Sequence, residues 1–325
     1  SFVCRQFLLK MSNLFLEDTI RDDMPEIPII RPPSEWRSLL VRITRGCKWN
    51  RCRFCGIYPH LGEPGFSIRS VAEIKRDIDL LKLHYPDAET AFFGDADPLQ
   101  AGADAFVEIA EYLRNVFPIK RLTCYARVST LWKFKRDAIK LLAQAGLNRL
   151  HIGLESGDAE TLRYHRKGQT PEMVKETAVW LKEAGIEISF YVLLGLGGRD
   201  HWQRHIYETA KLINETEPEF VRIRRLWPYE SNSPFSGPES PLLQEIRTGN
   251  FIPQTPEGTV LELGLLIERL HNLSTFVTCD HGNNYVQVSG RINEDKQTML
   301  AKIDAFLALP ESGREAHYLA VGSRI

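Results

Sequence analysis

The sequence predicts an α/β protein built on a parallel sheet that is either curled into a barrel or wound open. Segments rich in aliphatic and β-branched residues alternate six times with segments whose apolar residues recur at helical spacing. Glycine directly follows two of the helical segments, as Gly146 and Gly185, which is a common position for a residue that ends a helix. No literal sequence repeat accompanies the alternation.

Each element follows from one of these two patterns. The first strand is predicted at residues 37–44, which are mostly aliphatic, and the first helix at residues 70–84, where Val71, Ile74 and Ile78 share one face. The remaining strands are predicted at residues 90–94, 121–127, 149–155, 186–194 and 220–226. The remaining helices of the alternation are predicted at residues 103–116, 135–145, 171–184 and 200–215.

The two ends of the chain depart from the alternation. Four prolines before residue 37 (Pro25, Pro28, Pro32 and Pro33) predict an arm laid over the main body. After residue 226 a segment rich in Pro, Ser and Gly predicts an irregular loop. Beyond the loop, helices are predicted at residues 256–270 and 294–307, with a strand at residues 286–288. The predicted division is an N-terminal arm at 1–36, a main body at 37–226 and a C-terminal extension at 227–325.

Three cysteines that follow the first strand give the strongest chemical signal. Cys47, Cys52 and Cys55 are spaced C-x4-C-x2-C, and a soft, highly charged metal centre is the usual reason to gather thiolates that repel one another. A structural zinc site takes four ligands, and His60 is the only local candidate for the fourth. A four-iron cluster held by three cysteines instead leaves one iron open to a small molecule. Zinc with a remote fourth ligand stays as the alternative.

Charge and cysteine usage bear on partners and location. The formal net charge is −1, so we expect neither a nucleic acid nor a membrane as partner. No apolar run approaches the roughly 18 residues that cross a bilayer. Half of the six cysteines crowd one loop, and Cys4, Cys124 and Cys279 are scattered singles. We therefore expect reduced thiols and a cytoplasmic protein rather than a disulfide framework.

Four segments together resemble the radical S-adenosylmethionine (SAM) superfamily. An aromatic residue precedes the last cysteine in Cys52-Arg-Phe-Cys55, and three glycine-containing turns follow later strands. These turns are Phe93-Gly-Asp-Ala-Asp-Pro98, Gly153-Leu-Glu-Ser-Gly157 and Leu193-Leu-Gly-Leu-Gly-Gly198. The resemblance spans residues 37–226 and implies a partial (β/α)6 TIM-like barrel with short N- and C-terminal extensions, the second of which would cover the barrel mouth.

One departure limits the assignment within the superfamily. Most members place three residues between the first two cysteines, and this chain has four. The extra residue lengthens the loop without removing a ligand. It weakens the likeness to well-studied branches such as the oxygen-independent coproporphyrinogen oxidases, and the end of the chain is similar to uncharacterised iron–sulfur oxidoreductases.

The resemblance implies the cofactors and their chemistry. Cys47, Cys52 and Cys55 would hold a [4Fe-4S] cluster whose open iron binds the amino and carboxylate groups of SAM. An electron from a low-potential donor such as flavodoxin or ferredoxin would cleave SAM reductively to a 5′-deoxyadenosyl radical, which takes a hydrogen atom from a small-molecule substrate.

The resemblance also implies which residues bind SAM. Asp95 and backbone groups near Gly94 would receive the amino group, and Glu155 would accept hydrogen bonds from the ribose hydroxyls. The adenine would lie between an aromatic ring and a glycine backbone that permits close approach. The full set assigned to the cofactor on this basis is Phe54, Gly94, Asp95, Glu155, Ser156, Gly195 and Gly197.

Side-chain alternation predicts a cationic lumen. A strand of a barrel points alternate side chains inward, and with Val221 and Ile223 against the helices, Arg222 and Arg224 face the lumen. The same argument turns Tyr191 and Arg127 inward. Arginines in a water-poor cavity need anionic partners, of which a carboxylate is the best. One partner would be the SAM carboxylate, and Arg127 is grouped with the cofactor residues. The other arginines predict an anionic substrate.

Each of these assignments has an alternative. Arg222 and Arg224 could instead pair with Glu219 in a structural network. Cys279 and His281 are predicted either to reach the barrel mouth as hydrogen or proton donors or to cap a turn. His151 and Cys124 are predicted to be interior residues. The predicted catalytic residues are therefore Arg222, Arg224, Tyr191 and His281.

Two other functions stay open at this stage. The chain could bind an iron–sulfur cluster or zinc without radical turnover, or it could be a heme-pathway oxidase related to coproporphyrinogen oxidase. Cobalamin-dependent methyl transfer is not expected, because only the arm precedes the first strand.

Overall fold

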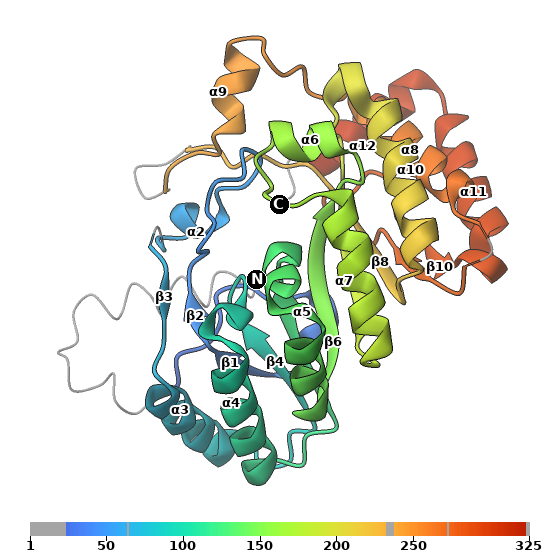
Figure 1. Cartoon of the computed structure of the whole chain (residues 1–325). Coiled ribbons are helices and arrows are strands. Elements are labelled where there is room, and N and C mark those ends of the chain that lie inside the picture. Colours follow the sequence, from blue (N-terminus) through green and yellow to red (C-terminus); the bar gives the residue numbers. More distant parts are fainter. Residues whose placement is uncertain (1–23, 64, 232–236, 272, 323–325) are drawn as a thin grey trace.

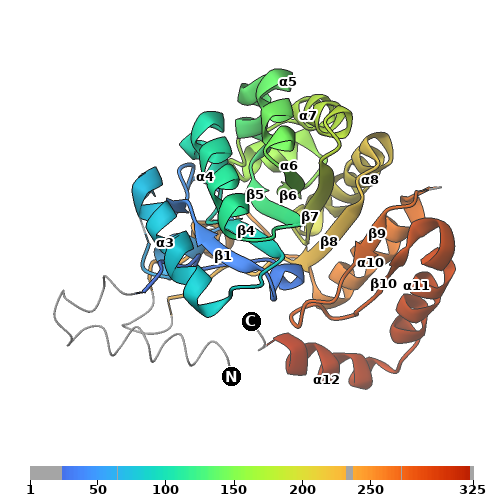
Figure 2. The same cartoon turned by 90° about the horizontal axis from the view of Figure 1, so that it is seen from below.

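The computed structural model describes residues 24–63, 65–231, 237–271 and 273–322, and its described strands form one eight-stranded sheet and a small two-stranded one. The large sheet has the order β1-β4-β5-β6-β7-β8-β9-β10. All of its neighbouring pairs are parallel except β9 with β10. The sheet curves, and helices cover its convex side (Figure 1, Figure 2). The fold is a partial TIM-like barrel, as predicted.

The six predicted strands of the main body are confirmed. They are β1 (Leu39–Arg42), β4 (Thr90–Gly94), β5 (Arg121–Ala126), β6 (Leu147–Glu155), β7 (Glu187–Leu194) and β8 (Phe220–Arg225). The helices that connect them include α3 (Val71–His84), α4 (Ala103–Val116), α5 (Val128–Gln144), α7 (Pro171–Glu183) and α8 (Gly198–Thr216).

Local sequence signals explain where several helices begin and end. Ser70 and Glu73 form a capping box at the start of α3. Thr170 caps α7, which begins with a proline at its first position. Gly146 and Gly185 have φ angles of +89° and +73° just after α5 and α7, so the chain turns there in a conformation that favours glycine.

Two predicted elements have other boundaries. The helix predicted at 135–145 begins at Val128, and Lys135 inside it has the non-helical angles φ 64° and ψ 179°. Residues 286–288 are not a strand. Val286 and Val288 are buried, but the ladder pairs run through β9 (Phe276–Thr278) and β10 (Ser289–Arg291). A short apolar run indicates burial, not hydrogen-bond pairing, which explains the error.

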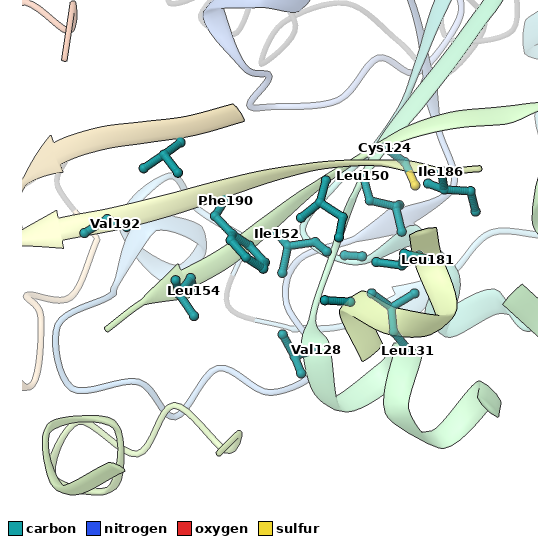
Figure 3. Packing of buried hydrophobic residues seen from close by; sticks show 14 of the residues in the cluster. Cys124, Val128, Leu131, Leu150, Ile152, Leu154, Leu181, Ile186, Phe190 and Val192 are labelled. Atoms are coloured by element: carbon teal, nitrogen blue, oxygen red, sulfur yellow. The ribbon is translucent and has the colours of Figure 1, made fainter. Parts of the chain in front are cut away.

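The core lies between the sheet and its helices. Leu150, Ile152 and Leu154 of β6 and the matching apolar residues of β7 pack against Val128, Leu131 and Leu181 of α5 and α7 (Figure 3). Cys124 belongs to this core, as predicted. The alternation argument is confirmed for β8, because Val221 and Ile223 are also in the core cluster. The residues between these apolar positions face the lumen.

The described part of the arm, from residue 24, is anchored beneath the barrel. Glu35 ends the short 3-10 helix η2 (Pro33–Glu35) and is fully buried. Its carboxylate accepts a 2.6 Å hydrogen bond from Ser38 and pairs with Arg121 at 2.9 Å. Nε2 of His151 lies 3.2 Å from the same carboxylate, so His151 is the hydrogen-bonded interior residue that the sequence predicted. Residues 1–23 of the predicted arm lie outside the described residues.

The first described part of the C-terminal extension packs on the cysteine loop, and the rest packs beside β8. Residues 237–242 lie against the cysteine loop, where the N–H of Leu242 donates to the carbonyl of Arg53 at 2.8 Å. The rest continues the sheet beyond β8, with helix α10 (Pro256–Arg269) beside α8 and helix α11 (Ile292–Leu307) beside α10 (Figure 2). Helices α6 (Ala159–Tyr164), α9 (Leu242–Arg247) and α12 (Glu311–Gly322) were not predicted. None of the helices in the described residues is both long and apolar enough to cross a membrane.

Candidate active site

The cysteine loop begins after β2 (Thr44–Arg45), a strand of the small two-stranded sheet, and ends at α2 (Ile57–His60). Cys47, Cys52 and Cys55 are all partly exposed, and none is in a disulfide. The loop rests on the segment after α6. There the indole of Trp49 donates a 2.7 Å hydrogen bond to the carbonyl of Arg166. The backbone N–H of Arg53 donates a 3.0 Å hydrogen bond to the carbonyl of His165.

The donor set of this loop fits an iron–sulfur cluster in its chemistry. Three thiols on one short loop are the soft ligands that such a cluster takes. Among the described residues, no group of three or more His, Cys, Asp or Glu side chains is already arranged to hold a metal ion. His60, the local candidate for a fourth zinc ligand, packs its ring 4.9 Å from that of Tyr229.

Burial keeps two thiols of this loop, those of Cys52 and Cys55, protonated at neutral pH. It raises the pKa of Cys55 to about 12 and also raises that of Cys52, although Lys167 and Arg127 act in the opposite direction. Thiolates at these positions therefore require a metal centre or added positive charge. The two basic side chains place that charge at Cys52.

Lys167 is a site residue that sequence analysis missed. Its ammonium is buried, forms a 2.7 Å ion pair with Glu155, and lies 5.8 Å from the centre of the Phe54 ring. Burial opposes its charge, but Glu155 and Cys52 raise its pKa. Arg127 donates a 2.7 Å hydrogen bond to the carbonyl of Lys167. No sequence pattern places residue 167 beside Cys52, because a helix and a turn separate Lys167 from its strand.

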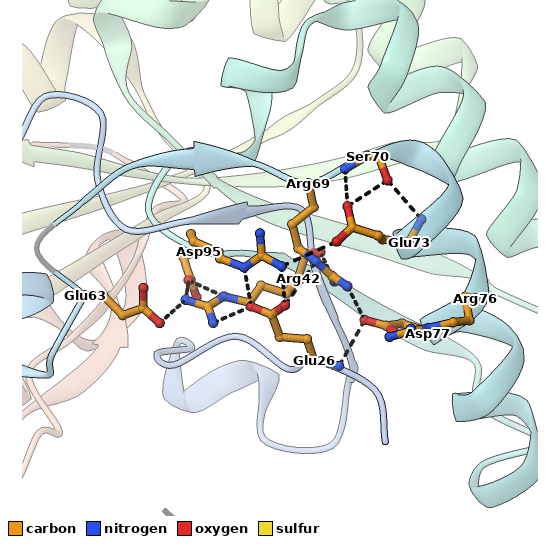
Figure 4. Close-up of polar contacts among 10 residues, drawn as sticks. Glu26, Arg42, Glu63, Arg69, Ser70, Glu73, Arg76, Asp77 and Asp95 are labelled. Carbon is orange, nitrogen blue, oxygen red and sulfur yellow. Dashed lines mark hydrogen bonds and ion pairs between the residues drawn. The ribbon is translucent and has the colours of Figure 1, made fainter. Parts of the chain in front are cut away.

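In the turn after β4, both carboxylate oxygens of Asp95 already have partners within the protein. Asp95 is fully buried, and Arg42 contacts its Oδ2 atom through Nε at 2.7 Å and Nη2 at 2.6 Å (Figure 4). Its Oδ1 atom accepts a 2.9 Å hydrogen bond from the N–H of Ile29. Burial raises the pKa of Asp95 to about 6, even though Arg42 lowers it. Of the two groups predicted to receive the SAM amino group, the backbone near Gly94 is therefore the better placed.

The other two turns are each fixed by a buried side chain. Oγ of Ser156 lies 2.7 Å from Nδ1 of His205 on α8, so Ser156 holds the turn after β6 to a helix. The N–H of Gly195 donates a 2.6 Å hydrogen bond to Glu262 of α10. Gly197 precedes α8, and a Cβ atom there would come within 2.9 Å of the His201 backbone.

The lumen holds aromatic rings and two arginines. Ring centres of Phe92, Tyr125, His151 and Tyr191 lie 5.1 to 6.3 Å apart. The guanidinium of Arg224 lies 5.7 Å from the Tyr191 ring centre, and Nε of Arg222 donates a 3.3 Å hydrogen bond to Ser189. Burial raises the pKa of Tyr191 despite both nearby arginines, so its hydroxyl stays protonated.

Cys279 and His281, the two candidates from the C-terminal extension, differ in their exposure. Cys279 is fully buried in the hydrophobic core, so the prediction that it could reach the barrel mouth is wrong. The N–H of Cys279 donates a 2.8 Å hydrogen bond to the carbonyl of Val288, which continues the pairing of β9 with the β10 side of the chain. His281 is partly exposed, and its Nδ1 lies 2.6 Å from Oδ1 of Asn283. Burial and the charge of Arg224 lower the pKa of His281.

A cavity of about 220 Å³ lies on the outer side of the glycine-rich turn. Its wall includes Gly197 and Arg199 at the start of α8, Tyr164 of α6 and Phe251. Of the predicted site residues only Gly197 is in that wall, so this cavity is separate from the cysteine loop and from the lumen arginines.

The Radical SAM superfamily model matches residues 41–212, more than half of the chain, and the chain belongs to this superfamily. It is therefore an enzyme whose cofactors are a [4Fe-4S] cluster and SAM. The three-cysteine loop, the alternation of strands and helices and the order of the turns were the basis of the sequence prediction, which is confirmed at the level of the superfamily.

Individual relatives cover different reactions. The chain is 25% identical over 200 residues to the hopanoid C-3 methylase of Methylococcus capsulatus, covering 62% of this chain and 35% of that protein. It is 25% identical over 189 residues to the oxygen-independent coproporphyrinogen III oxidase of Helicobacter pylori, covering 53% of this chain and 38% of that protein. It thus spans less than two fifths of either relative.

Among solved structures, the fold is similar to that of the cobalamin-dependent SAM radical enzyme OxsB with aqua-cobalamin and SAM bound. The TM-score is 0.52 at 15% identity, covering 88% of this chain and 47% of that one. At this identity the likeness concerns the fold alone. Relatives that are methylases and oxidases leave the reaction class open, and the expectation against cobalamin-dependent methyl transfer stays untested.

Proposed function

We propose that this enzyme takes a hydrogen atom from a small anionic substrate held in the barrel lumen by Arg222 and Arg224. The observation that carries the proposal is that both arginines face the lumen and that neither has a carboxylate partner among the described residues. Glu219, the structural partner considered from the sequence, instead accepts a 2.7 Å hydrogen bond from the N–H of Ile188. A partly buried guanidinium without a protein anion is a ready hydrogen-bond donor and charge partner for a carboxylate or phosphate.

The residues around the lumen have separate tasks in this proposal. When bound, the cluster and SAM supply the oxidising radical, and Cys47, Cys52 and Cys55 are the residues that would hold the cluster. Lys167 keeps positive charge beside Cys52 and fixes Glu155, whose carboxylate is proposed to bind the ribose. The aromatic rings between the turns and the arginines exclude water, which protects a reactive intermediate from side reactions.

The cofactor part of the proposal is tested by iron content and SAM cleavage. Protein reconstituted without oxygen should bind about four irons and sulfides per chain and form 5′-deoxyadenosine from SAM and a strong reductant. Cys52→Ala should lose both properties, whereas Cys124→Ala, at a thiol in the hydrophobic core, should keep its iron. Stoichiometric zinc in place of iron would refute the proposal.

The substrate part is tested with Arg222. Arg222→Met should abolish the metabolite change that the wild-type protein causes in anaerobic cells, because the anion loses its partner. The purified variant should still bind iron and cleave SAM without substrate. Arg269→Met, on the outer helix α10 against Tyr207, is the control and should behave as wild type. Loss of the cluster in Arg222→Met would show that the arginine is structural.

A heme-pathway oxidase is the second candidate. The coproporphyrinogen III oxidase of Helicobacter pylori is among the relatives, and the two lumen arginines suit a substrate that carries several carboxylates. Oxidation of coproporphyrinogen III by the reconstituted protein would establish this candidate. Absence of binding to this compound would exclude it and leave the broader anionic class.

We also propose an acidic low-potential protein, a flavodoxin or a ferredoxin, as electron donor. Lys48, Arg51, Arg163 and Arg166 are exposed around the cysteine loop and make no ion pair with a described residue. We name these four residues the basic rim. Positive charge without ion pairs to the described residues, gathered around the cysteine loop of a chain with net charge −1, favours a negatively charged partner. The need to keep the loop thiols reduced is the basis for proposing the cytoplasm as its location.

A further inference from the structure

The arm contacts the turn at which SAM is proposed to bind through its amino group. Pro28 lies so close to Gly94 that a Cβ atom on the glycine would come within 2.6 Å of the proline Cβ. The next residue, Ile29, donates its N–H to Asp95 at 2.9 Å. Arm residues 28 and 29 therefore cover one side of the turn and satisfy one oxygen of its carboxylate.

Arg42 ties the same turn to the arm. It contacts Oδ2 of Asp95 at 2.7 Å through Nε, and Nη1 donates a 2.7 Å hydrogen bond to Glu26 (Figure 4). The side chains of Arg42 and Asp95 are 6% and 0% exposed. Glu63 lies farther from the guanidinium, at 3.3 Å. Removing one partner of such a buried group is costly, so the guanidinium is held mainly by Asp95 and Glu26 together. The position of Asp95 thus depends on the presence of the arm.

Glu26 gathers three arginines in this cluster. Besides Arg42, it accepts hydrogen bonds of 2.8 and 2.7 Å from Arg45 and lies 3.2 Å from Nε of Arg69. Although burial acts in the opposite direction, these contacts lower the pKa of Glu26, so the carboxylate is ionised at neutral pH. Without the negative charge of Glu26, the repulsion among the three guanidinium groups would be less well balanced. The arm would also lose the ion pairs that attach residue 26 to the barrel.

We propose that arm residues 26–29 are part of the cofactor site and that Glu26, acting through Arg42, is a positioning residue for the Gly94–Asp95 turn. The inference rests on the proposed binding of SAM at that turn. Arm docking and SAM binding stabilise each other, because both select the same arrangement of the turn. Asp95, with both carboxylate oxygens bound, fixes the position of the turn, and the backbone of the turn binds the cofactor.

The first test compares charge variants of Glu26. Its side chain is 30% exposed, so Glu26→Gln should fold and bind iron like the wild type. Its KM for SAM should rise about tenfold, within the usual range of coupling between sites, while kcat at saturating SAM stays unchanged. Glu26→Asp, which keeps the charge, should restore part of the affinity. Glu89→Gln, at an exposed pair with Lys120, is the control and should bind SAM normally.

The second test does not depend on turnover. Backbone hydrogen exchange of the peptide covering residues 24–31 should slow when SAM binds to the reconstituted wild-type protein. Glu26→Gln should exchange faster than wild type in the same peptide. Unchanged or faster exchange on SAM binding, or normal SAM affinity in Glu26→Gln, would overturn the inference alone. Wild-type protein that holds no iron and binds no SAM would instead overturn the proposed function.

Discussion

At the scale of the single residue, the buried pair of Lys167 and Glu155 joins the cysteine loop to the turn after β6. The ammonium and carboxylate are 2.7 Å apart with side chains 9% and 11% exposed. Lys167 also acts on the pKa of Cys52. Two residues twelve positions apart thus couple a predicted ribose ligand to a predicted cluster ligand, and each loses its charge partner if the other is removed.

Lys167→Met should destabilise the fold by about 3 kcal/mol, because it leaves the Glu155 carboxylate buried without a cation. Urea unfolding measures this loss. Lys175→Met, at an exposed pair with Glu215, should cost less than about 1 kcal/mol. The double variant Lys167→Met with Glu155→Leu should recover much of the stability. Equal losses in both single variants would show that the pair has no special role.

Glu262 makes stability depend on pH in a definite direction. Burial raises its pKa from 4.5 to about 7, although the bond from Gly195 lowers it. The folded protein therefore holds a proton between pH 4.5 and 7 that the unfolded chain releases. The stabilising contribution is complete below pH 4.5 and is lost as the pH rises to 7. Relative to Glu262→Gln, the wild type should lose up to roughly 3 kcal/mol across this window.

Urea unfolding of both proteins at pH 5 and pH 7.5 checks this prediction. Other titrating groups, among them His165 and His205 with pKa values lowered to about 4 by burial, cancel in the comparison because both proteins carry them. A difference between the two proteins that stays constant with pH would contradict the prediction. A difference that grows in favour of the wild type at high pH would reverse its sign.

At the scale of the element, the turns after the strands are fixed by close packing against helices. A Cβ atom on Gly157, after β6, would come within 2.3 Å of the carbonyl oxygen of Glu208 on α8. Real Cβ atoms do not approach backbone that closely, so the glycine is required by the neighbouring helix and not by its own φ angle. The turn therefore keeps a fixed position relative to α8.

Gly157→Ala should therefore cost about 2 kcal/mol, in the range for overpacking, and should weaken SAM binding because the turn shifts. Thermal unfolding and SAM affinity measure the two effects. Gly313→Ala is the matched control, because a Cβ atom there meets nothing within 4 Å. In α12 this substitution should be neutral or slightly stabilising. Unchanged stability in Gly157→Ala would mean that the helix can move away.

The sequence predicted which segments are buried better than it predicted which backbone groups pair. Hydrophobic spacing predicted the six strands and their helices, because burial of one face dictates residue type along the chain. Val286 and Val288 gave the same apolar signal and are buried, but the ladder with β9 begins at Ser289, next to a 2.8 Å hydrogen bond from the N–H of Cys279 to the carbonyl of Val288. Burial shapes the sequence more strongly than hydrogen-bond partners do, since the backbone is the same at every residue.

At the scale of the whole molecule, positive charge gathers around the cysteine loop. The chain carries a net charge of −1, yet the basic rim surrounds the cysteine loop without ion pairs to the described residues. Uneven charge of this kind acts on the rate of association more than on stability. The rim should therefore matter for the donor protein and not for the fold.

Charge reversal of the rim tests the donor proposal. Arg51→Glu with Arg166→Glu should weaken binding to a reduced acidic flavodoxin and slow SAM cleavage driven by it by at least tenfold. Cleavage driven by a small chemical reductant should stay unchanged. Lys120→Glu with Lys211→Glu, on the outer surface, should not alter either rate. Equal losses with both reductants would show that the rim serves the site itself.

The sequence by itself determined the fold class, the cluster loop and the inward faces of the strands. These properties depend on residue type and on spacing of two, three or four along the chain, which local physics fixes. Only the tertiary structure placed Lys167 beside Cys52, Glu262 under Gly195 and Glu26 at the turn after β4. Such contacts join residues far apart in the sequence, and their pairing depends on how the whole chain closes, which no local pattern records.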